Sequence, residues 1–506
     1  MSATISALGF FFLAFGTYLF YEIVWRLYFS PISRFPGPRI AAITLLYELW
    51  YELVKGGQYT FKIAELHEKY GPIIRINPWE IHINDPDYYD EIYAGAGKKR
   101  DKTWYQSIQF GNPDAVLTTI PHDLHRIRRA PIHKFFSKAS VTKLEPQIQS
   151  TIDKLCARLK AIQAEKKPLT MSQAWYCVTM DIITEYSFGE SEDYTSNAPD
   201  FHTTLEDAFD GTARAGTVIK QVPWILPLME KLPRSIVKVL NPQILGLLDI
   251  QEASQPSSKS MEAQVTAIKN SLDLGPKSTS YPTIFHEILS TDDLPESEKM
   301  VHRVKQEGQV IIAAGGETTA YALSVITYHV LSNQEIYTKL KEELKPVFEN
   351  TEGRPKAKDL EHLPYLNAVI SEGLRLSYGS STHLQRVAPD QELRYGDWVI
   401  PRGTPVSMTS VLLHHNETIF PSSRTFSPDR WLENPRLSKY LVSFSRGSRA
   451  CLGINLAWVE LYLCVSYVFT QFPDMQLWDT TIKEVELVAD YFLPKTNGKG
   501  VKVKLN

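Results

Sequence analysis

The chain has 506 residues and a formal net charge of −3 at pH 7, so no basic excess indicates nucleic-acid binding. Hydrophobic residues make up 43% and aromatic residues 11% of the chain, which is enough for one large core. The 4 cysteines fit neither a zinc finger nor a disulfide-rich scaffold, and a reducing, cytosol-facing compartment suits them.

The N-terminal segment MSATISALGFFFLAFGTYLFY, at residues 1–21, carries no charged side chain, and Glu22 and Arg26 end it. About 20 apolar residues span a bilayer as a helix. A cleaved signal peptide is the alternative, but the basic n-region and the small-residue cleavage site are missing. Arg26, Arg34 and Arg39 follow the apolar run, so the positive-inside rule predicts a retained anchor with the rest of the chain in the cytosol.

A proline-rich segment, SPISRFPGP, follows at residues 30–38 and predicts a stiff hinge, because proline fixes φ and ends helices. We therefore divide the chain into a membrane anchor at residues 1–28, a hinge at residues 29–40 and one main domain at residues 41–506.

Hydrophobic periodicity in the main domain indicates amphipathic helices and a few short strands. Helices are predicted at residues 60–70, 85–94, 172–188, 307–328, 334–348 and 363–376, and strand pairs at residues 73–84 and 393–406. Residues 218–250 are apolar but interrupted by prolines, and residues 251–281 are rich in Ser and Pro, which predicts a surface loop.

The helix predicted at residues 307–328 contains the run AGGETT at residues 314–319. Each glycine in a helix interior costs about 1 kcal/mol relative to Ala, so the pair needs a reason. One reason is close helix packing. The other is a local opening for a diatomic ligand and water, with Thr318 and Glu317 delivering protons, and we favour it because of the cysteine loop described next.

The segment FSRGSRACLG, at residues 444–453, is suited to present a thiolate. Gly447 and Gly453 let the backbone wrap on either side of Cys451. A helix that begins just after Cys451 would aim free N–H groups at the sulfur, which lowers a cysteine pKa and favours metal binding. The alternative is a small buried hydrophobic residue, as most free cysteines are.

The pattern F-x-x-G-x-R-x-C-x-G in this segment closely resembles the haem-thiolate loop of the cytochrome P450 family, whose axial cysteine favours O–O cleavage. Three further family patterns occur in order: A-G-x-[D/E]-T-[T/S] at residues 314–319, E-x-x-R at residues 372–375, and Pro-Asp-Arg at residues 428–430 for the P-E-R-like motif. The resemblance covers about residues 20–500.

The resemblance implies a mainly α-helical fold with small antiparallel β-sheets and haem b between the oxygen-binding helix and the cysteine-loop helix. Cys451 would be the iron ligand. The family has W-x-x-x-R where this chain has His125 and Arg129, and both Trp and His rings donate an N–H. The cofactor-binding residues implied by the resemblance are His125, Arg129, Gly315, Arg386, Phe444, Arg449 and Gly453.

The resemblance also implies that Thr318 and Glu317 manage protons and that a buried structural triad forms from Glu372, Arg375 and Arg430. Residues 104–117 would roof the substrate, and residues 218–250 would form a mobile lid near the membrane. The residues expected to line the substrate pocket are Trp104, Tyr105, Phe110, Val116, Ala314, Thr382, His383 and Phe492.

The implied reaction is RH + O2 + two electrons + two protons giving ROH + H2O. Because the chain has no nucleotide-binding fingerprint, the electrons would come from a separate NADPH-dependent cytochrome P450 reductase. The alternatives are an O2-independent haem-thiolate isomerase or dehydratase, which often lacks the helix threonine, and a non-catalytic haem-binding sensor, which needs no proton-delivery groups. Thr318 and Glu317 argue against both.

An anchor followed by a proline-rich hinge resembles microsomal members of the family, which implies a single-pass protein of the endoplasmic reticulum membrane. The sequence around the segments SPISRFPGPR and HDLHRIRR resembles that of secondary-metabolite oxygenases of filamentous fungi, including trichodiene-oxygenase-like enzymes. That resemblance implies a lipophilic terpenoid or polyketide-type substrate.

Overall fold

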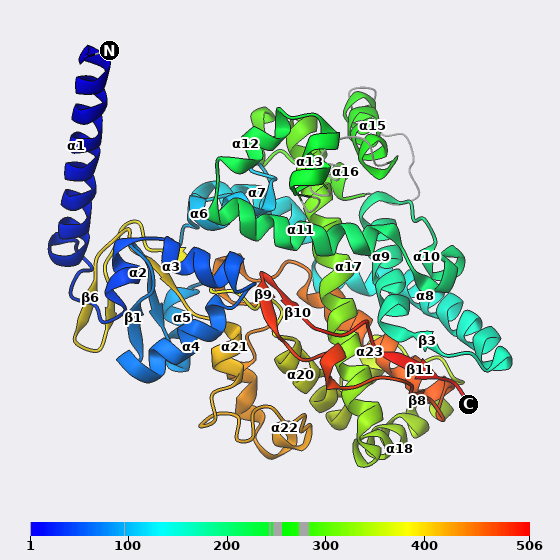
Figure 1. Cartoon of the computed structure of the whole chain (residues 1–506). Helices are drawn as coiled ribbons and strands as arrows, with labels where there is room; N and C mark the ends of the chain where they lie inside the picture. Colours follow the sequence, from blue (N-terminus) through cyan, green and yellow to red (C-terminus); the bar gives the residue numbers. More distant parts are fainter. Residues whose placement is uncertain (1, 96, 242–243, 246–255, 273–282) are drawn as a thin grey trace.

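The computed structural model describes residues 2–95, 97–241, 244–245, 256–272 and 283–506 (Figure 1). Helices dominate these residues, and the strands among them form four small sheets. The helix α1 (Ser2–Val24) stands away from the rest of the molecule, whereas α17 (Val301–Ser332) runs through the middle of the helical part. The mainly helical architecture predicted from the sequence is confirmed.

The core is built around α17, which packs against α9 (Met171–Phe188), α15 (Pro256–Leu272), α20 (Pro364–Ser377) and α23 (Ile454–Gln471). A Cβ atom at Gly315 would overlap Ile183 of α9, and one at Gly316 would overlap Met180 of the same helix. The interpretation of this glycine pair as a local opening is wrong, because α17 is continuous and the glycines let α9 approach closely.

The largest sheet has the strand order β1-β2-β7-β4 and lies beside the N-terminal helices (Figure 1). The predicted pair around residues 73–84 forms as β1 (Ile73–Arg75) and β2 (Ile81–Ile83), which are antiparallel with Ile73 opposite Ile83. β2 then pairs in parallel with β7 (Pro405–Ser407), and β7 pairs antiparallel with β4 (Arg386–Val387). The parallel pair departs from the predicted all-antiparallel arrangement, and the intervening helices supply its long crossover.

The other sheets are antiparallel and short. β5 (Leu393–Tyr395) pairs with β6 (Trp398–Ile400), as predicted around Gly396-Asp397, although Val406 belongs to β7 in the largest sheet. The remaining two sheets pair β9 (Ala489–Tyr491) with β10 (Leu493–Lys495), and β11 (Lys502–Lys504) with both β3 (Leu169–Thr170) and β8 (Gln476–Leu477).

The surface loop predicted at residues 251–281 is wrong for its middle part, which forms α15. Met261, Val265 and Ile268 lie four and three residues apart and are buried, so one helical face packs against α17. The Ser- and Pro-rich composition masked this short stripe. The rest of that prediction, at residues 251–255 and 273–281, lies outside the described residues.

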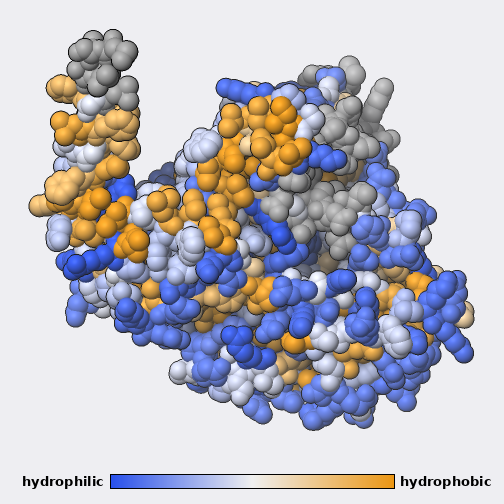
Figure 2. Space-filling view, in the orientation of Figure 1, coloured by the Kyte–Doolittle hydropathy of each residue, from blue (hydrophilic) through white to orange (hydrophobic). Residues whose placement is uncertain are grey.

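The apolar segment at residues 218–250 contains the end of α11 (Thr204–Gln221) and two short helices, α12 (Ile225–Glu230) and α13 (Arg234–Leu240). Residues 242–243 and 246–250 of this predicted lid lie outside the described residues. Figure 2 shows hydrophobic side chains gathered on this part of the surface and along α1. The exposed members at this segment are Trp224, Leu228, Ile236, Val239 and Leu240.

Candidate functional site

The cysteine loop ends where α23 begins at Ile454, three residues after Cys451. Gly447 has φ +71°, and a Cβ atom there would overlap the backbone oxygens of Tyr93 and Ala94. The N–H of Cys451 donates to the carbonyl of Phe444 at 2.9 Å, which closes the loop. Glycine is therefore required at position 447 by both conformation and packing.

Gly453 differs from Gly447. Its φ is −84°, and nothing lies within 4 Å of a Cβ atom built on it. Neither the backbone nor the protein around it explains the glycine, so the prediction that it frees the loop to wrap is wrong. Its place among the cofactor-binding residues stays a prediction.

Cys451 is exposed, whereas the other three cysteines, Cys156, Cys177 and Cys464, are buried. Burial nevertheless raises the pKa of the Cys451 thiol, against the opposing effects of the Gly453 N–H and of Arg129. The start of the helix and Arg129 act to lower this pKa, as predicted, but desolvation outweighs both in the protein alone. A thiol that solvent reaches, yet that protein surrounds, lies at an internal position suited to a ligand.

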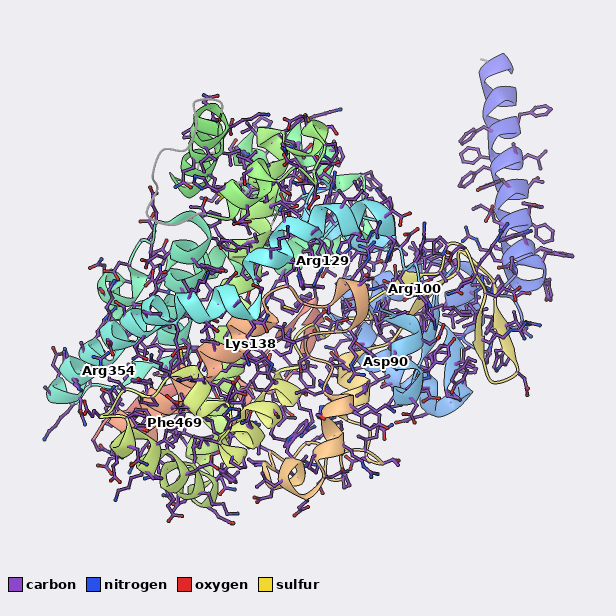
Figure 3. All side chains as sticks on the ribbon, turned by 180° about the vertical axis from the view of Figure 1, so that it is seen from behind. Asp90, Arg100, Arg129, Lys138, Arg354 and Phe469 are labelled. Carbon is purple, nitrogen blue, oxygen red and sulfur yellow. The ribbon has the colours of Figure 1, made fainter. Side chains whose placement is uncertain are left out.

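Basic side chains from four segments converge near this thiol. Arg129 and His125 lie on α7 (His122–Phe135), on which Figure 3 labels Arg129, while Arg386 lies on β4 and Arg449 precedes Cys451. Burial, followed by the charges of neighbouring basic groups, lowers the pKa of Arg449 to about 9 and that of His125 to about 2. The same two causes hold the pKa of Lys102 well below its usual value.

These cations have few compensating partners. Arg449 donates to three backbone carbonyls, of Arg100 at 3.0 Å, Thr119 at 2.6 Å and Ile120 at 2.6 Å. Within the described ranges, Arg129, Arg386 and Arg449 form no ion pair with a carboxylate; burying cations in this way is unfavourable without an anion. An accessible thiol beside unpaired cations fits an iron centre that carries carboxylates, so the residues present suit haem.

Lys102 is a member of this cluster that the sequence did not reveal. The backbones of Asp101 and Val387 exchange hydrogen bonds of 2.8 and 2.9 Å, which brings the neighbouring residues Lys102 and Arg386 together. The side chain of Lys102 also donates to the carbonyl of Leu117. A single lysine in a loop has no pattern that sequence analysis can detect, since only this long-range bridge places it.

The predicted proton-handling residues lie on α17. Ala314 and Thr318 are exposed one turn apart, although Gly316 and Thr319 on the same helix are buried. The hydroxyl of Thr318 donates to the carbonyl of Ala314 at 2.8 Å, and Glu317 is partly buried one position away. Ala314 and Thr318 therefore share one open face of an otherwise packed helix. Gly315 packs toward α9, so its predicted cofactor contact stays a prediction.

The predicted triad is brought together in the structure. Arg375 binds Glu372 with two hydrogen bonds of 2.8 and 2.7 Å, and both side chains are 0% exposed. The Arg430 Nε atom lies 3.2 Å from the same carboxylate. Trp431, which the sequence did not single out, donates from its indole to Glu372 at 2.9 Å. The bidentate pair and its additional donors saturate this buried carboxylate.

The residues predicted to line the substrate pocket fall into separate groups. The rings of Phe110 and Phe492 meet edge to face, with centroids 4.8 Å apart. The N–H of Val116 donates to both carboxylate oxygens of Glu307 on α17, at 2.9 and 3.1 Å, which holds the roofing segment against that helix. Trp104 is 56% exposed and does not join this group.

Tyr105, Thr382 and His383 are buried instead of open to solvent. The hydroxyl of Tyr105 donates to Glu48 at 3.1 Å, and His383 is 1% exposed with neither ring nitrogen hydrogen-bonded. Tyr105 and His383 belong to a buried polar layer next to the aromatic pair Phe110 and Phe492. Their direct contact with substrate stays a prediction.

Comparison with known proteins agrees with this geometry. The Cytochrome P450 family model matches residues 36–482. The chain is 44% identical over 502 residues to Cytochrome P450 monooxygenase MO6277 of Ascocoryne sarcoides, which covers 96% of this chain and 97% of the relative. It is 40% identical over 484 residues to Tryptophan 6-hydroxylase fscE of Fusarium equiseti, covering 94% and 93%. It is 35% identical over 476 residues to Cytochrome P450 monooxygenase TRI4 of Trichoderma arundinaceum, covering 93% and 89%.

Proposed function

The chain belongs to the cytochrome P450 family, and from that premise we propose which of its residues carry the reaction. It is a haem-thiolate monooxygenase that acts on small-molecule metabolites, like its fungal relatives. When bound, haem supplies the iron at which O2 is reduced and one oxygen atom is transferred to the substrate. The remaining steps are assigned to side chains of this chain.

Cys451 is the iron ligand in this proposal, and the observation that carries it is the convergence of basic residues beside an accessible thiol. Arg129, Arg386 and Arg449 bind the propionate carboxylates of haem, and His125 adds a neutral N–H donor. Phe444, whose carbonyl closes the loop, packs against Trp458 of α23 and keeps the sulfur side apolar.

Thr318 handles the protons that the reaction consumes. Its Oγ1 atom donates to Ala314 in the resting helix, and the same hydroxyl is on the open face of α17, where it can turn to donate elsewhere. Glu317 is one residue, or about 100° of helix, away and so faces a different direction. We assign Glu317 to the supply of protons from solvent and Thr318 to their delivery.

We propose attachment to the endoplasmic reticulum membrane with the main domain in the cytosol, and electrons from an NADPH-dependent cytochrome P450 reductase. The apolar helical stretch Gly9–Phe29 is a candidate membrane span of 21 residues, with 0% of it buried. The exposed hydrophobic residues of α12 and α13 add a second apolar surface, which suits an interface position (Figure 2). The second apolar helix, α17, is 61% buried and belongs to the core.

For the substrate we propose a lipophilic secondary metabolite of terpenoid or polyketide type. The aromatic pair Phe110 and Phe492 supports an apolar ligand. A second candidate is an aromatic amino-acid derivative, because one relative is named a tryptophan 6-hydroxylase and a buried polar layer adjoins the same aromatic pair.

The test of the ligand assignment is Cys451→Ala in the haem-reconstituted protein. We expect complete loss of the thiolate-type spectrum of the reduced carbon-monoxide complex, with Cys464→Ala as the matched control that keeps it. Cys464 is buried on α23, the helix that follows the loop. A normal spectrum in the Cys451 variant would remove the basis of the proposal.

A further inference from the structure

A second set of buried charged groups lies at the C-terminal end of α11. Four carboxyl groups come from separate parts of the chain and are at most 4% exposed. Lys220 of α11, 5% exposed, is the cation whose charge acts on all four. The four are Glu48 of α3 (Leu46–Leu49), Glu52 of the adjoining helical turn η2 (Trp50–Val54), Glu80 between β1 and β2, and Asp490 of β9.

One of these carboxyls is a fully paired anion. Glu48 accepts from Lys220 at 2.9 Å, Gln221 at 3.0 Å, and both Tyr105 and Asn77 at 3.1 Å. Burial alone would raise its pKa, but Lys220 and the hydrogen bonds lower it to about 2. Lys220, the cation of this cluster, is thus already paired with Glu48.

Glu80 and Asp490 are held differently, by neutral donors. Glu80 accepts from Ser407 at 2.5 Å and from Asn77 at 2.9 Å, and Gln385 also donates to it. Burial still raises its pKa to about 8. Asp490 accepts from Thr60 at 2.6 Å, Ser381 at 2.7 Å and the Phe492 N–H at 3.0 Å, and burial raises its pKa as well.

Several polar atoms in this cluster have no partner. Among the described residues, Glu52 Oε2, Gln221 Oε1 and both ring nitrogens of His383 are buried without a hydrogen bond. The Nε2 atom of His383 points at the cluster, 3.7 Å from the Glu80 carboxyl. A buried polar group without a partner costs about 1–3 kcal/mol, so four such atoms in one place need an explanation.

Once the Glu52 carboxyl has lost its proton, the unpartnered atoms are mainly acceptors: a carboxylate oxygen, an amide oxygen and one imidazole nitrogen, against a single imidazole N–H. Their surroundings carry four carboxyl groups and one cation that Glu48 already binds. The missing partner is therefore a group with several N–H donors and positive charge. A carboxylate ligand would meet the wrong sign and too few donors.

The cluster adjoins the expected substrate space. Phe492, which donates to Asp490 through its N–H, is also in ring contact with Phe110. Tyr105 binds Glu48, and the carbonyl of His383 accepts from Gln106 at 3.1 Å, next to Tyr105 in the roofing segment. A ligand resting on the two phenylalanines would thus extend its polar end toward Glu52 and His383.

We propose that this cluster is the subsite for a basic amino group of the substrate, bound by Glu52, Gln221 and His383 at the end of α11. The proposal rests on the proposed monooxygenase function and narrows its substrate to an amphiphilic amine. Because the cluster is buried, entry of the amine requires the end of α11 to move aside.

Binding of the amine should release a proton, which can be measured. Burial, with Asp490 and Glu48 acting in the same direction and Lys220 against them, holds the pKa of Glu52 well above its usual value, which favours the neutral carboxyl before binding. An ammonium group beside it favours the carboxylate. Binding therefore converts a neutral carboxylic acid and a protonated amine into a carboxylate–ammonium pair and releases one proton, that of the Glu52 carboxyl, to solvent.

The test uses the full-length, haem-loaded protein and three probes of one shape: tryptamine, neutral 3-propylindole and anionic indole-3-propionate. Equilibrium dialysis should show tryptamine binding roughly 10–100-fold more tightly than either, the range of one charged hydrogen bond. Glu52→Gln should remove that preference. Glu65→Gln, at a side chain 64% exposed on α4 (Tyr59–Tyr70), should leave it.

Calorimetry of the unmodified protein in two buffers of different ionisation enthalpy gives an independent measurement, with one proton released per tryptamine bound. Equal affinities, a preference that survives Glu52→Gln, as direct binding of the amine to iron would give, or no proton release would each overturn the subsite. A missing thiolate-type spectrum would instead contradict the proposed function, so the two failures are distinguishable.

Discussion

The protein contains two buried clusters of ionisable groups, one of arginines beside Cys451 and one of carboxyl groups under α11. The two clusters differ in how burial affects their charge. Around Cys451, burial lowers the pKa values of Arg129, Arg386 and Arg449, but these arginines stay charged and form no ion pair with a carboxylate of the described residues. Under α11, burial raises the pKa of Glu80 to about 8 and holds that of Glu52 well above its usual value, which favours the neutral carboxyl groups. Buried arginines therefore need an anion at all times, because they stay charged. Buried carboxyl groups can instead remain protonated until a cation binds.

The largest expected effect comes from a third buried set of charges, the triad of Glu372, Arg375 and Arg430. It shows how much stability depends on a buried charge that is fully paired. Glu372→Ala leaves Arg375 buried without its carboxylate, which costs about 3–5 kcal/mol of unfolding free energy. Urea unfolding should show this loss. Glu335→Ala, at a side chain 74% exposed on α18 (Gln334–Asn350), is the control and should change stability little. A small loss at position 372 would mean that pairing is not what separates the triad from the two clusters.

The second expected effect concerns the cation cluster. Arg129→Leu removes a side chain that we propose binds a propionate, so haem affinity should fall roughly 10–100-fold, the range expected for one charged hydrogen bond. The haem-free protein should be no less stable, because a desolvated cation has been removed. Haem transfer to an acceptor protein and urea unfolding of the haem-free form measure the two quantities.

Arg126→Leu, at an exposed position on the same helix, is the matched control and should retain haem. Destabilisation of the haem-free Arg129 variant would show that this arginine is a structural residue. The contrast with the acid cluster would then fail.

The third expected effect concerns the open face of α17. Thr318→Ala should keep haem but lower product formed per NADPH several-fold, with the difference appearing as hydrogen peroxide, because proton delivery at Oγ1 is lost. Thr318→Ser keeps a hydroxyl and should restore much of the coupling. Full coupling in the alanine variant would reduce Thr318 to a packing residue.

The sequence predicted local contacts by spacing and a few distant ones through family motifs, such as Arg430 with Glu372, and it missed distant contacts that have neither signal. Glu372 and Arg375 are three residues apart on one helix, so the E-x-x-R spacing alone anticipates their meeting. The acid cluster instead joins Glu48, Lys220 and Asp490, which are separated by more than a hundred residues each and carry no shared pattern. Only the fold makes them neighbours.

Other differences have the same origin. The sequence could show that Gly315 needs a reason but not that Ile183 of α9 occupies the space. It also predicted the cysteine loop and the groups that lower the thiol pKa, but not the burial of Cys451 that opposes them, because burial depends on the surrounding helices. Burial and neighbours, which set both results, are properties of the packed chain.

The last and most gradual expected effect is a slope of stability with pH, in which the Glu80 variant isolates the contribution of one member of the acid cluster. Burial raises the pKa of Glu80 from 4.5 to about 8, so between these values the folded protein keeps a proton that the unfolded chain loses. Its contribution to stability is complete below about pH 4.5 and is lost as the pH rises toward 8, by at most about 1.4 kcal/mol per pH unit.

Glu80→Gln imitates the protonated acid, since its amide can form hydrogen bonds with Ser407 and Gln385. The variant should flatten this part of the stability profile. Glu48→Gln has the opposite effect, because it leaves the buried Lys220 without a charged partner. It should destabilise the protein at every pH from 5 to 8. Urea unfolding at pH 5, 6, 7 and 8 distinguishes them: parallel profiles for the unmodified and Glu80→Gln proteins would mean that Glu80 is charged, and that the acid cluster does not rest in a protonated state.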